Sequence, residues 1–171
     1  MPREPVDTDV ARLVRGAQRG DRAAFDELYR RFARMVHGVV LARVSRIDVD
    51  DLVQDVFLAA WQRLAALREP AAFGGWLATI ARHRATDHGR RERPMEALVN
   101  DVPSPKQGDR LEALAILDAI KSLPEAYNET LVLRLVEGMT GAEIAVRTGL
   151  TEASVRVNLH RGMKLLREKL A

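Results

Sequence analysis

The last fifth of the sequence contains a pattern typical of two helices joined by a tight turn. Thr140 is a candidate helix cap, and Glu143 three residues later can complete a capping box with it. Gly149 stands where a left-handed residue ends a helix, and Thr151 can cap the next one. The spacing therefore predicts a helix-turn-helix over residues 140–161, with the second helix continuing beyond it.

The second helix of this pair is predicted to be amphipathic. Its apolar residues recur every three or four positions and form one stripe, which consists of Val155, Leu159, Met163, Leu166 and Leu170. The side chains off that stripe are mostly basic, and they are Arg156, Val157, His160, Arg161 and Lys164. Such a face fits the major groove of DNA, where Arg and polar side chains meet base edges. An ordinary C-terminal helix with a solvated basic face has the same pattern.

Composition narrows the class of protein. The chain has 171 residues, 47% of them hydrophobic, and contains no cysteine, so disulfides and thiolate ligands are excluded. No apolar run approaches the roughly 20 residues of a membrane span, and residues 1–9 lack the apolar stretch of a signal peptide. We expect a cytoplasmic protein without membrane insertion. The net charge is only +3, but basic residues gather in two stretches, 82–93 and 156–169.

Helical periodicity runs through nearly the whole chain, and no strand alternation of useful length occurs. The first half contains three predicted amphipathic helices. Asp21 can cap the first, Asp48 or Asp50 can cap the second, and the third carries Phe73, Trp76 and further apolar residues. None of these helices is stable alone, so their apolar faces are expected to pack together.

The helical pattern fails in the middle of the chain, where prolines and a glycine interrupt it and the apolar residues lose their periodicity. We predict an all-α protein with two small helical domains, residues 8–93 and 111–171, joined by a flexible linker over residues 94–110. The four histidines show no metal-ligand spacing, and neither a P-loop nor a Gly-x-Ser-x-Gly motif is present. We therefore expect no enzyme activity, no catalytic residues, no metal and no cofactor.

Three segments, in this order, resemble bacterial RNA polymerase sigma factors of the extracytoplasmic-function group. They run from Asp50 to Trp61, from Phe73 to Arg82, and from Leu123 through the helix-turn-helix. The resemblance covers nearly the whole chain. It implies a sigma-two-like and a sigma-four-like domain that bind core polymerase, recognise the −10 and −35 promoter elements and assist in opening the DNA.

The same resemblance implies contacts with protein partners. Asp51, Gln54, Asp55 and Leu58 match the patch that binds the clamp helices of the largest polymerase subunit. The spacing of Asp51, Asp55 and Leu58 places them on one helical face, and acidic groups suit a basic protein surface. Acidic residues also favour a helix N-terminus, which is a competing explanation for Asp51 and a weaker one for Asp55. The flap of the second-largest subunit and an anti-sigma protein are further implied partners.

Two sets of residues are implied to contact promoter DNA. The loop before Phe73 matches the segment that captures a base flipped out of the −10 element, for which a loop offers backbone groups. With the basic cluster that follows, the −10 set is Arg68, Glu69, Pro70, Ala71, Phe73, Arg82, His83, Arg84, Arg90 and Arg91. The −35 set is Arg156, Val157, His160, Arg161 and Lys164. Within it, Arg161 is predicted to donate to a guanine and thereby to discriminate between bases.

The chain departs from the family pattern at His83, at Asn158, at Gly162-Met163 and at Gly74-Gly75, where bulkier residues are common. These positions lie on or beside the predicted reading surfaces, so the recognised promoter sequence stays open.

Two other functions each explain part of the sequence. A stand-alone helix-turn-helix regulator explains residues 111–171 equally well, but it leaves the segment from Asp51 to Trp61 unexplained. A passive helical adaptor that binds only protein leaves both basic clusters unused. Tight binding to duplex DNA without polymerase would favour the regulator, because a sigma factor needs the core enzyme to bind specifically.

Overall fold

The computed structural model describes residues 6–91 and 107–171. Its α-helices are α1 (Val6–Gln18), α2 (Arg22–Leu41), α3 (Val49–Arg63), α4 (Phe73–Arg91), α5 (Gln107–Lys121), α6 (Glu125–Leu131), α7 (Gly141–Thr148) and α8 (Glu152–Leu170). Short 3-10 turns at Arg46–Asp48, Leu64–Ala66 and Pro70–Ala72 and a π turn at Val132–Val136 complete the regular structure of these residues. The predicted all-α class is confirmed. Among the described helices, none combines the length and the apolar character that crossing a membrane requires.

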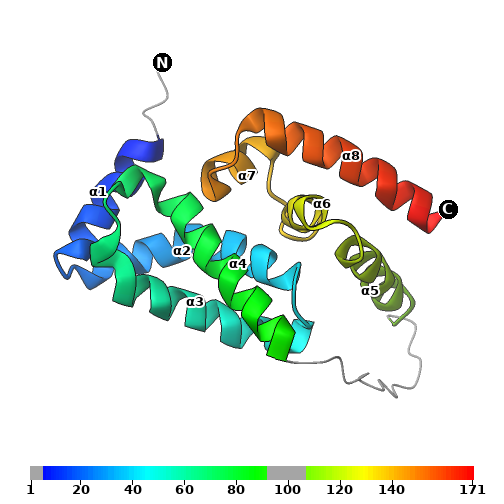
Figure 1. The fold of residues 1–171 in the computed structure, drawn as a ribbon, viewed down its shortest axis with the longest axis horizontal. Coiled ribbons are helices and arrows are strands. Elements are labelled where there is room, and N and C mark those ends of the chain that lie inside the picture. The colour runs from blue at the N-terminus through cyan, green and yellow to red at the C-terminus, as the bar shows by residue number, and fades with distance from the viewer. Residues whose placement is uncertain (1–5, 92–106) are drawn as a thin grey trace.

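Helices α1 to α4 form an N-terminal bundle around an apolar core (Figure 1). Aromatic rings pack edge-on within it: the ring centres of Phe32 and Phe73 are 5.1 Å apart, and those of Phe25 and Trp61 are 4.9 Å apart. Helix α2 begins after Asp21, whose carboxylate accepts a hydrogen bond of 3.2 Å from a backbone amide of the first turn. The prediction of this cap is confirmed.

Two features of the N-terminal bundle differ from the expectation. No helix was predicted before Asp21, yet α1 packs along α2 and buries Val10, Val14 and Ala17. Their spacing of four and three is helical, but so short a run is a weak signal. Asp48 occupies the N-cap position of α3 without a side-chain cap hydrogen bond, because a 3-10 turn leads into the helix there.

Helices α5 to α8 form a C-terminal bundle in which α6 contacts both α5 and α8. Pro124 occupies the N-cap position of α6 and separates it from α5. Helix α5 begins at Gln107, within the range 94–110 expected to be a linker, and Asp109 in its first turn complements the helix dipole. The rest of that range, 94–106, lies outside the described residues.

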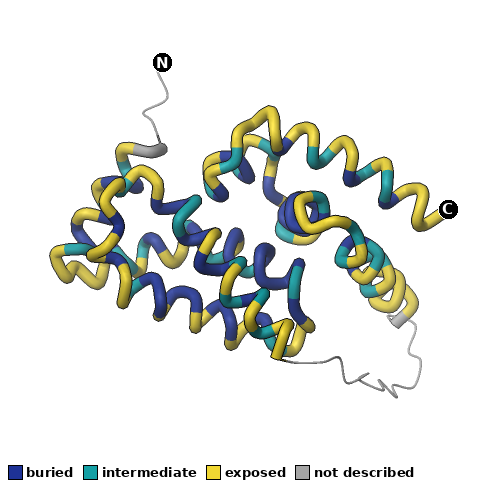
Figure 2. Tube along the Cα trace, in the orientation of Figure 1, coloured by how far each residue is buried: buried dark blue, intermediate teal, exposed yellow. Residues whose placement is uncertain are grey.

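The two bundles lie against each other. Helix α7 contacts α2 and α4, and the π turn contacts α2. Buried apolar residues form one cluster that extends through both bundles. Figure 2 shows that buried segments line the sides on which the bundles meet, whereas much of α8 is exposed along the edge of the molecule. The sequence predicts two separate domains, whereas in the structure the two bundles share one apolar core.

Candidate protein and nucleic-acid interfaces

The helix-turn-helix has the predicted local geometry. The hydroxyl of Thr140 accepts a 3.2 Å hydrogen bond from the backbone amide of Glu143, and the carboxylate of Glu143 accepts one of 2.7 Å from the backbone amide of Thr140. Gly149 ends α7 in the left-handed conformation, with φ of 76°. Thr151 then caps α8 by accepting a 3.1 Å hydrogen bond from the amide of Ser154. The capping box and both turn residues are confirmed, so α7 and α8 have a fixed relative orientation.

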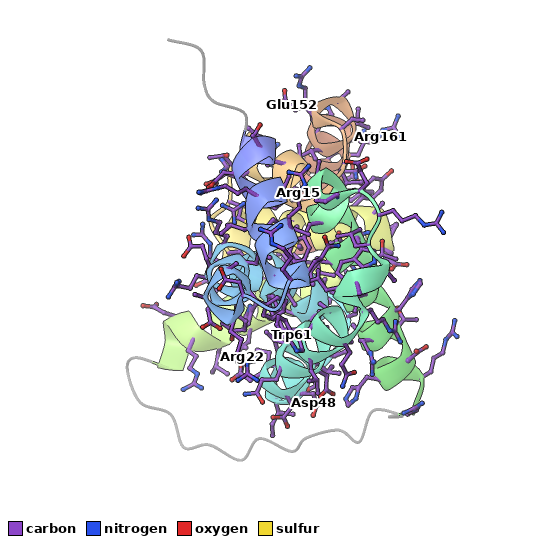
Figure 3. All side chains as sticks on the ribbon, turned by 90° about the vertical axis from the view of Figure 1, so that its left-hand side faces the viewer. Arg15, Arg22, Asp48, Trp61, Glu152 and Arg161 are labelled. Atoms are coloured by element: carbon purple, nitrogen blue, oxygen red, sulfur yellow. The ribbon has the colours of Figure 1, made fainter. Side chains whose placement is uncertain are left out.

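The predicted −35 set lies on one exposed face of α8. All of its members are exposed, namely Arg156, Val157, His160, Arg161 and Lys164. In Figure 3, Arg161 on α8 lies in the upper part of the view, and Asp48, just before α3, lies at the bottom. The side chain of Val157 is 44% exposed amid these basic residues. An apolar group on such a face can contact a thymine methyl, while Arg161 can reach a base edge.

Gly162 has a structural role that the sequence did not indicate. It is buried where α8 crosses α6, and an added Cβ would lie 3.0 Å from a Leu131 methyl and 3.2 Å from the Tyr127 Cβ. The absent side chain therefore allows the two helices to approach closely. Its position beside the apolar stripe, between Leu159 and Leu166, was the available signal.

The predicted acidic patch is exposed on α3. Asp51, Gln54, Asp55 and Leu58 all reach solvent, and the apolar side chain of Leu58 is 56% exposed. An exposed leucine beside two carboxylates suits a protein partner better than DNA, because phosphates would be repelled. Asp55 also lines a cleft between α3 and α4 whose opposite wall includes His83, Arg84 and Arg91. The predicted polymerase patch and the predicted −10 cluster therefore adjoin.

A side chain of α1 holds the segment that leads into the predicted base-capturing loop. The side-chain amide of Gln18 donates hydrogen bonds to the carbonyls of Leu64, at 3.0 Å, and Leu67, at 2.9 Å. Among the loop residues assigned to the −10 set, Arg68, Glu69 and Ala71 are exposed and Pro70 is half-buried.

Phe73 is placed differently from the prediction. Its side chain is fully buried and packs against Phe32 and Trp76, so it supports the loop from the core and is out of reach of a base in this arrangement. Its place among the apolar residues of the third predicted helix was the better guide.

Only part of the basic cluster of α4 is exposed to solvent and free to contact DNA. His83, Arg90 and Arg91 are exposed, and Arg84 is half-buried. Arg82 instead donates hydrogen bonds to both carboxylate oxygens of Glu129 on α6, the two shortest at 2.8 and 3.0 Å. In this arrangement it is engaged with the C-terminal bundle rather than free to hold a phosphate.

Glu129 is a buried charged residue at the contact between the bundles. Its side chain is 6% exposed, and Arg43, in the turn that follows α2, contacts the same carboxylate at 2.7 Å. Burial by itself would raise the pKa of Glu129, but hydrogen bonds and charges from Arg82 and Arg43 outweigh it and hold the pKa below its ordinary value. The hydrogen bond to Glu129 correspondingly raises the pKa of Arg82. The carboxylate is therefore ionised and doubly paired. Sequence reasoning missed Glu129 because its partners lie far away in the chain.

Comparison with known proteins identifies relatives over nearly the whole chain. The family model of Sigma-70 region 2 matches residues 28–94, and that of Sigma-70, region 4 matches residues 113–166. The ECF RNA polymerase sigma-E factor of Haemophilus influenzae is 31% identical over 181 residues, which cover 95% of this chain and 95% of that protein. The protein named probable RNA polymerase sigma factor RfaY, of Xanthomonas campestris, is longer: 32% identity over 184 residues covers 99% of this chain and 46% of RfaY.

A solved structure shares the fold. The structure of CnrH in complex with the cytosolic domain of CnrY has a TM-score of 0.67 to this chain at 26% sequence identity. The match covers 95% of this chain and 97% of that chain. CnrH of Cupriavidus metallidurans is an RNA polymerase sigma factor and is 31% identical to this chain over 180 residues.

Proposed function

The chain belongs to the extracytoplasmic-function group of bacterial RNA polymerase sigma factors, and on this premise we propose which residues contact polymerase and which contact promoter DNA. Sigma factors direct RNA polymerase to specific promoters. The observation that carries the assignment of sites is the separation of an exposed acidic patch on α3 from an exposed basic face on α8. The first surface suits a protein and the second suits DNA.

Polymerase docks on α3 in this proposal. Asp51, Gln54, Asp55 and Leu58 contact the clamp helices of the largest subunit, with the carboxylates facing basic groups and Leu58 providing apolar contact. The C-terminal bundle contacts the flap of the second-largest subunit. The factor catalyses no reaction of its own and works in the cytoplasm, where the polymerase is.

Promoter DNA is read at two surfaces. Arg161 and its neighbours on α8 enter the major groove of the −35 element. The exposed loop residues Arg68, Glu69 and Ala71 receive a base from the −10 element, and the exposed arginines of α4 hold its backbone. An anti-sigma protein regulates the factor, a proposal supported by the similarity to CnrH, which has been solved with the cytosolic domain of CnrY.

In vitro transcription tests the function directly. Purified chain and core polymerase are incubated with a library of genomic promoter fragments, and transcript start sites are mapped by sequencing. We expect a defined set of starts that depends on the chain and that shares −10 and −35 sequences. A chain that binds duplex fragments tightly by itself, yet selects no start with core polymerase, would be a stand-alone regulator.

Asp55→Arg tests the docking patch. Because Asp55 is exposed, the variant should fold normally, and reversing its charge should weaken core-polymerase binding by about 30-fold or more. Co-purification with core enzyme and a binding titration measure this. The matched control is Asp26→Arg, the same change at an exposed position of α2, which should bind like the wild type. Equal binding by both variants would place the docking surface elsewhere.

A further inference from the structure

The segment that joins α3 to α4 is held at each end by a short 3-10 turn. The backbone amide of Leu67 donates a 3.1 Å hydrogen bond to the carbonyl of Leu64, and the amide of Ala72 donates one of 2.9 Å to the carbonyl of Glu69. Both turns contact α1. Leu67 is buried, so Arg68 and Glu69 are the exposed residues between the two turns. The loop is therefore short, and α1 supports it.

Gln18, the last residue of α1, uses both donors of its side-chain amide on this segment. It donates to the carbonyl of Leu64 at 3.0 Å and to the carbonyl of Leu67 at 2.9 Å. An amide nitrogen carries two N–H donors, so neither is left for another partner. The Leu64 carbonyl also accepts from the amide of Leu67. Among the hydrogen bonds of the described residues, the Leu67 carbonyl accepts only from Gln18, which therefore determines the direction of that carbonyl.

The Leu67 carbonyl belongs to the same peptide unit as the backbone N–H of Arg68. The described residues contain no cis peptide bond, and the C=O and N–H bonds of a trans peptide point in opposite directions. The N–H of Arg68 therefore points away from Gln18 and α1. No backbone hydrogen bond within the described part of the chain uses this N–H, and Arg68 is exposed. It is an oriented donor that a ligand can reach.

Helix α1 is a firm support for this arrangement. Its residues Val10, Val14 and Ala17 are buried in the core beside α2. Asp9 of α1 also pairs with Arg31 of α2 at 2.5 Å. A binding group that is held by a packed helix keeps its position better than one held only by its own loop. The direction of the Arg68 amide is thus set from outside the loop.

We propose that Gln18 is a positioning residue for capture of the −10 base: it directs the N–H of Arg68 toward the flipped base, where this donor binds an acceptor atom on the base edge. This inference rests on the proposed function, in which the loop receives a base of the −10 element. Unstacking a base is costly, and the receiving groups offset that cost best when they are already held in place. Gln18 provides this preorganisation without touching DNA itself.

Two substitutions of Gln18 remove its donors while nearly preserving the size of the side chain. Gln18→Met adds no charge, whereas Gln18→Glu places a carboxylate against two carbonyl oxygens and should have the larger effect. The matched control is Ser122→Ala, which also removes a side-chain hydrogen bond to a carbonyl, that of Ala119 at 2.7 Å. Ser122 is exposed in the C-terminal bundle, away from the loop. Thermal unfolding checks that each variant is folded, and Gln18→Met carries the test if Gln18→Glu is not.

A double-mutant cycle between Gln18 and the captured base tests the proposal. Core polymerase with wild-type chain is bound to a promoter fragment chosen from the mapped start sites, and the −10 bases are replaced one at a time by abasic sites. The captured base is the one whose removal weakens binding most and beside which 2-aminopurine brightens on binding. We expect Gln18→Met to weaken binding of the intact fragment by about fivefold, the equivalent of one hydrogen bond, and to have no further effect on the abasic fragment.

The cycle separates positioning from a general structural role. Ser122→Ala should bind both fragments like the wild type, and every variant should bind core polymerase normally in the absence of DNA. An equal loss of affinity on intact and abasic fragments would show that Gln18 only supports the fold, and unchanged affinity on both would show that it does not act on the base; either result overturns the proposal. Failure of the proposed function has a different signature, because wild-type chain would then select no start site with core polymerase, and this inference would fall with it.

Discussion

Individual arginines in this protein differ in role according to their surroundings rather than their local sequence. Arg161 is exposed on α8, whereas Arg82, in an equally basic stretch, is paired with a carboxylate on another helix. Phe73 shows the same principle among apolar residues, because its ring is buried in the core although it was expected to contact DNA. Residue type alone does not predict whether a side chain is free to contact DNA, because burial and partners distant in the sequence determine this.

Arg161→Ala should selectively impair promoters that carry the preferred −35 sequence. A bidentate Arg–guanine contact contributes base discrimination, so transcription from such a promoter should fall roughly tenfold or more, with much less effect once that base pair is changed. Arg156→Ala, an expected phosphate contact, should reduce transcription similarly on every template and lessen its salt dependence. The measurement is in vitro transcription on paired templates. Uniform loss with Arg161→Ala would reassign this side chain to the DNA backbone.

At the scale of elements, capping interactions between nearby residues define where the two helices of the helix-turn-helix begin and end. Thr140 and Glu143 exchange hydrogen bonds at the start of α7, Gly149 ends it, and Thr151 starts α8. Each of these interactions lies within a few residues along the chain. The orientation of the exposed face of α8 depends on them, because α7 and α8 share so short a turn.

Thr140→Ala should therefore destabilise the C-terminal bundle. Losing an N-cap hydroxyl typically costs about 1 kcal/mol, and the free energy of unfolding should fall by about that amount in urea denaturation. Thr79→Ala is the matched control. Its exposed hydroxyl donates to the carbonyl of Gly75 in the same helix, so its loss should change stability by less than about 0.5 kcal/mol. Equal effects of the two changes would mean that the capping box contributes little.

Interactions that are local in sequence were predictable, and contacts between distant segments were not. The caps at Asp21, Thr140 and Thr151 and the helical class follow from nearby residues. Helix α1 was missed although Val10, Val14 and Ala17 recur at helical spacing. The pairing of Arg82 with Glu129 spans 47 residues. No local pattern specifies such a contact, so the sequence could propose candidates for the −10 set but could not predict which of them are exposed.

At the scale of the whole molecule, the contact between the bundles combines groups with different responses to pH. Glu129 has a lowered pKa and is ionised at neutral pH, so its ion pairs persist there. His37 of α2 differs, because it hydrogen-bonds to Glu137 after the π turn and is charged only when protonated. The polar contacts between the two bundles thus include ion pairs at Glu129 that are insensitive to pH near neutrality and a contact at His37 that is sensitive to it.

This difference predicts that the bundles separate more easily as the pH rises through the His37 transition. The hydrogen bond to Glu137 raises the pKa of His37 above its ordinary value of 6.5, burial opposes this, and the charges of Glu137 and Asp50 add to it. A raised pKa in the folded state means that the stabilisation is fully present below the ordinary pKa and is lost as the pH rises through the raised one.

The thermal unfolding midpoint of the wild type should therefore decline between about pH 6 and about pH 9, and His37→Gln should flatten that decline. His160→Gln, which changes an exposed histidine on α8, should keep the wild-type slope. Glu129 stays ionised throughout this range and contributes a constant amount. Identical slopes in the wild type and His37→Gln would mean that the protonation of His37 does not help to join the bundles.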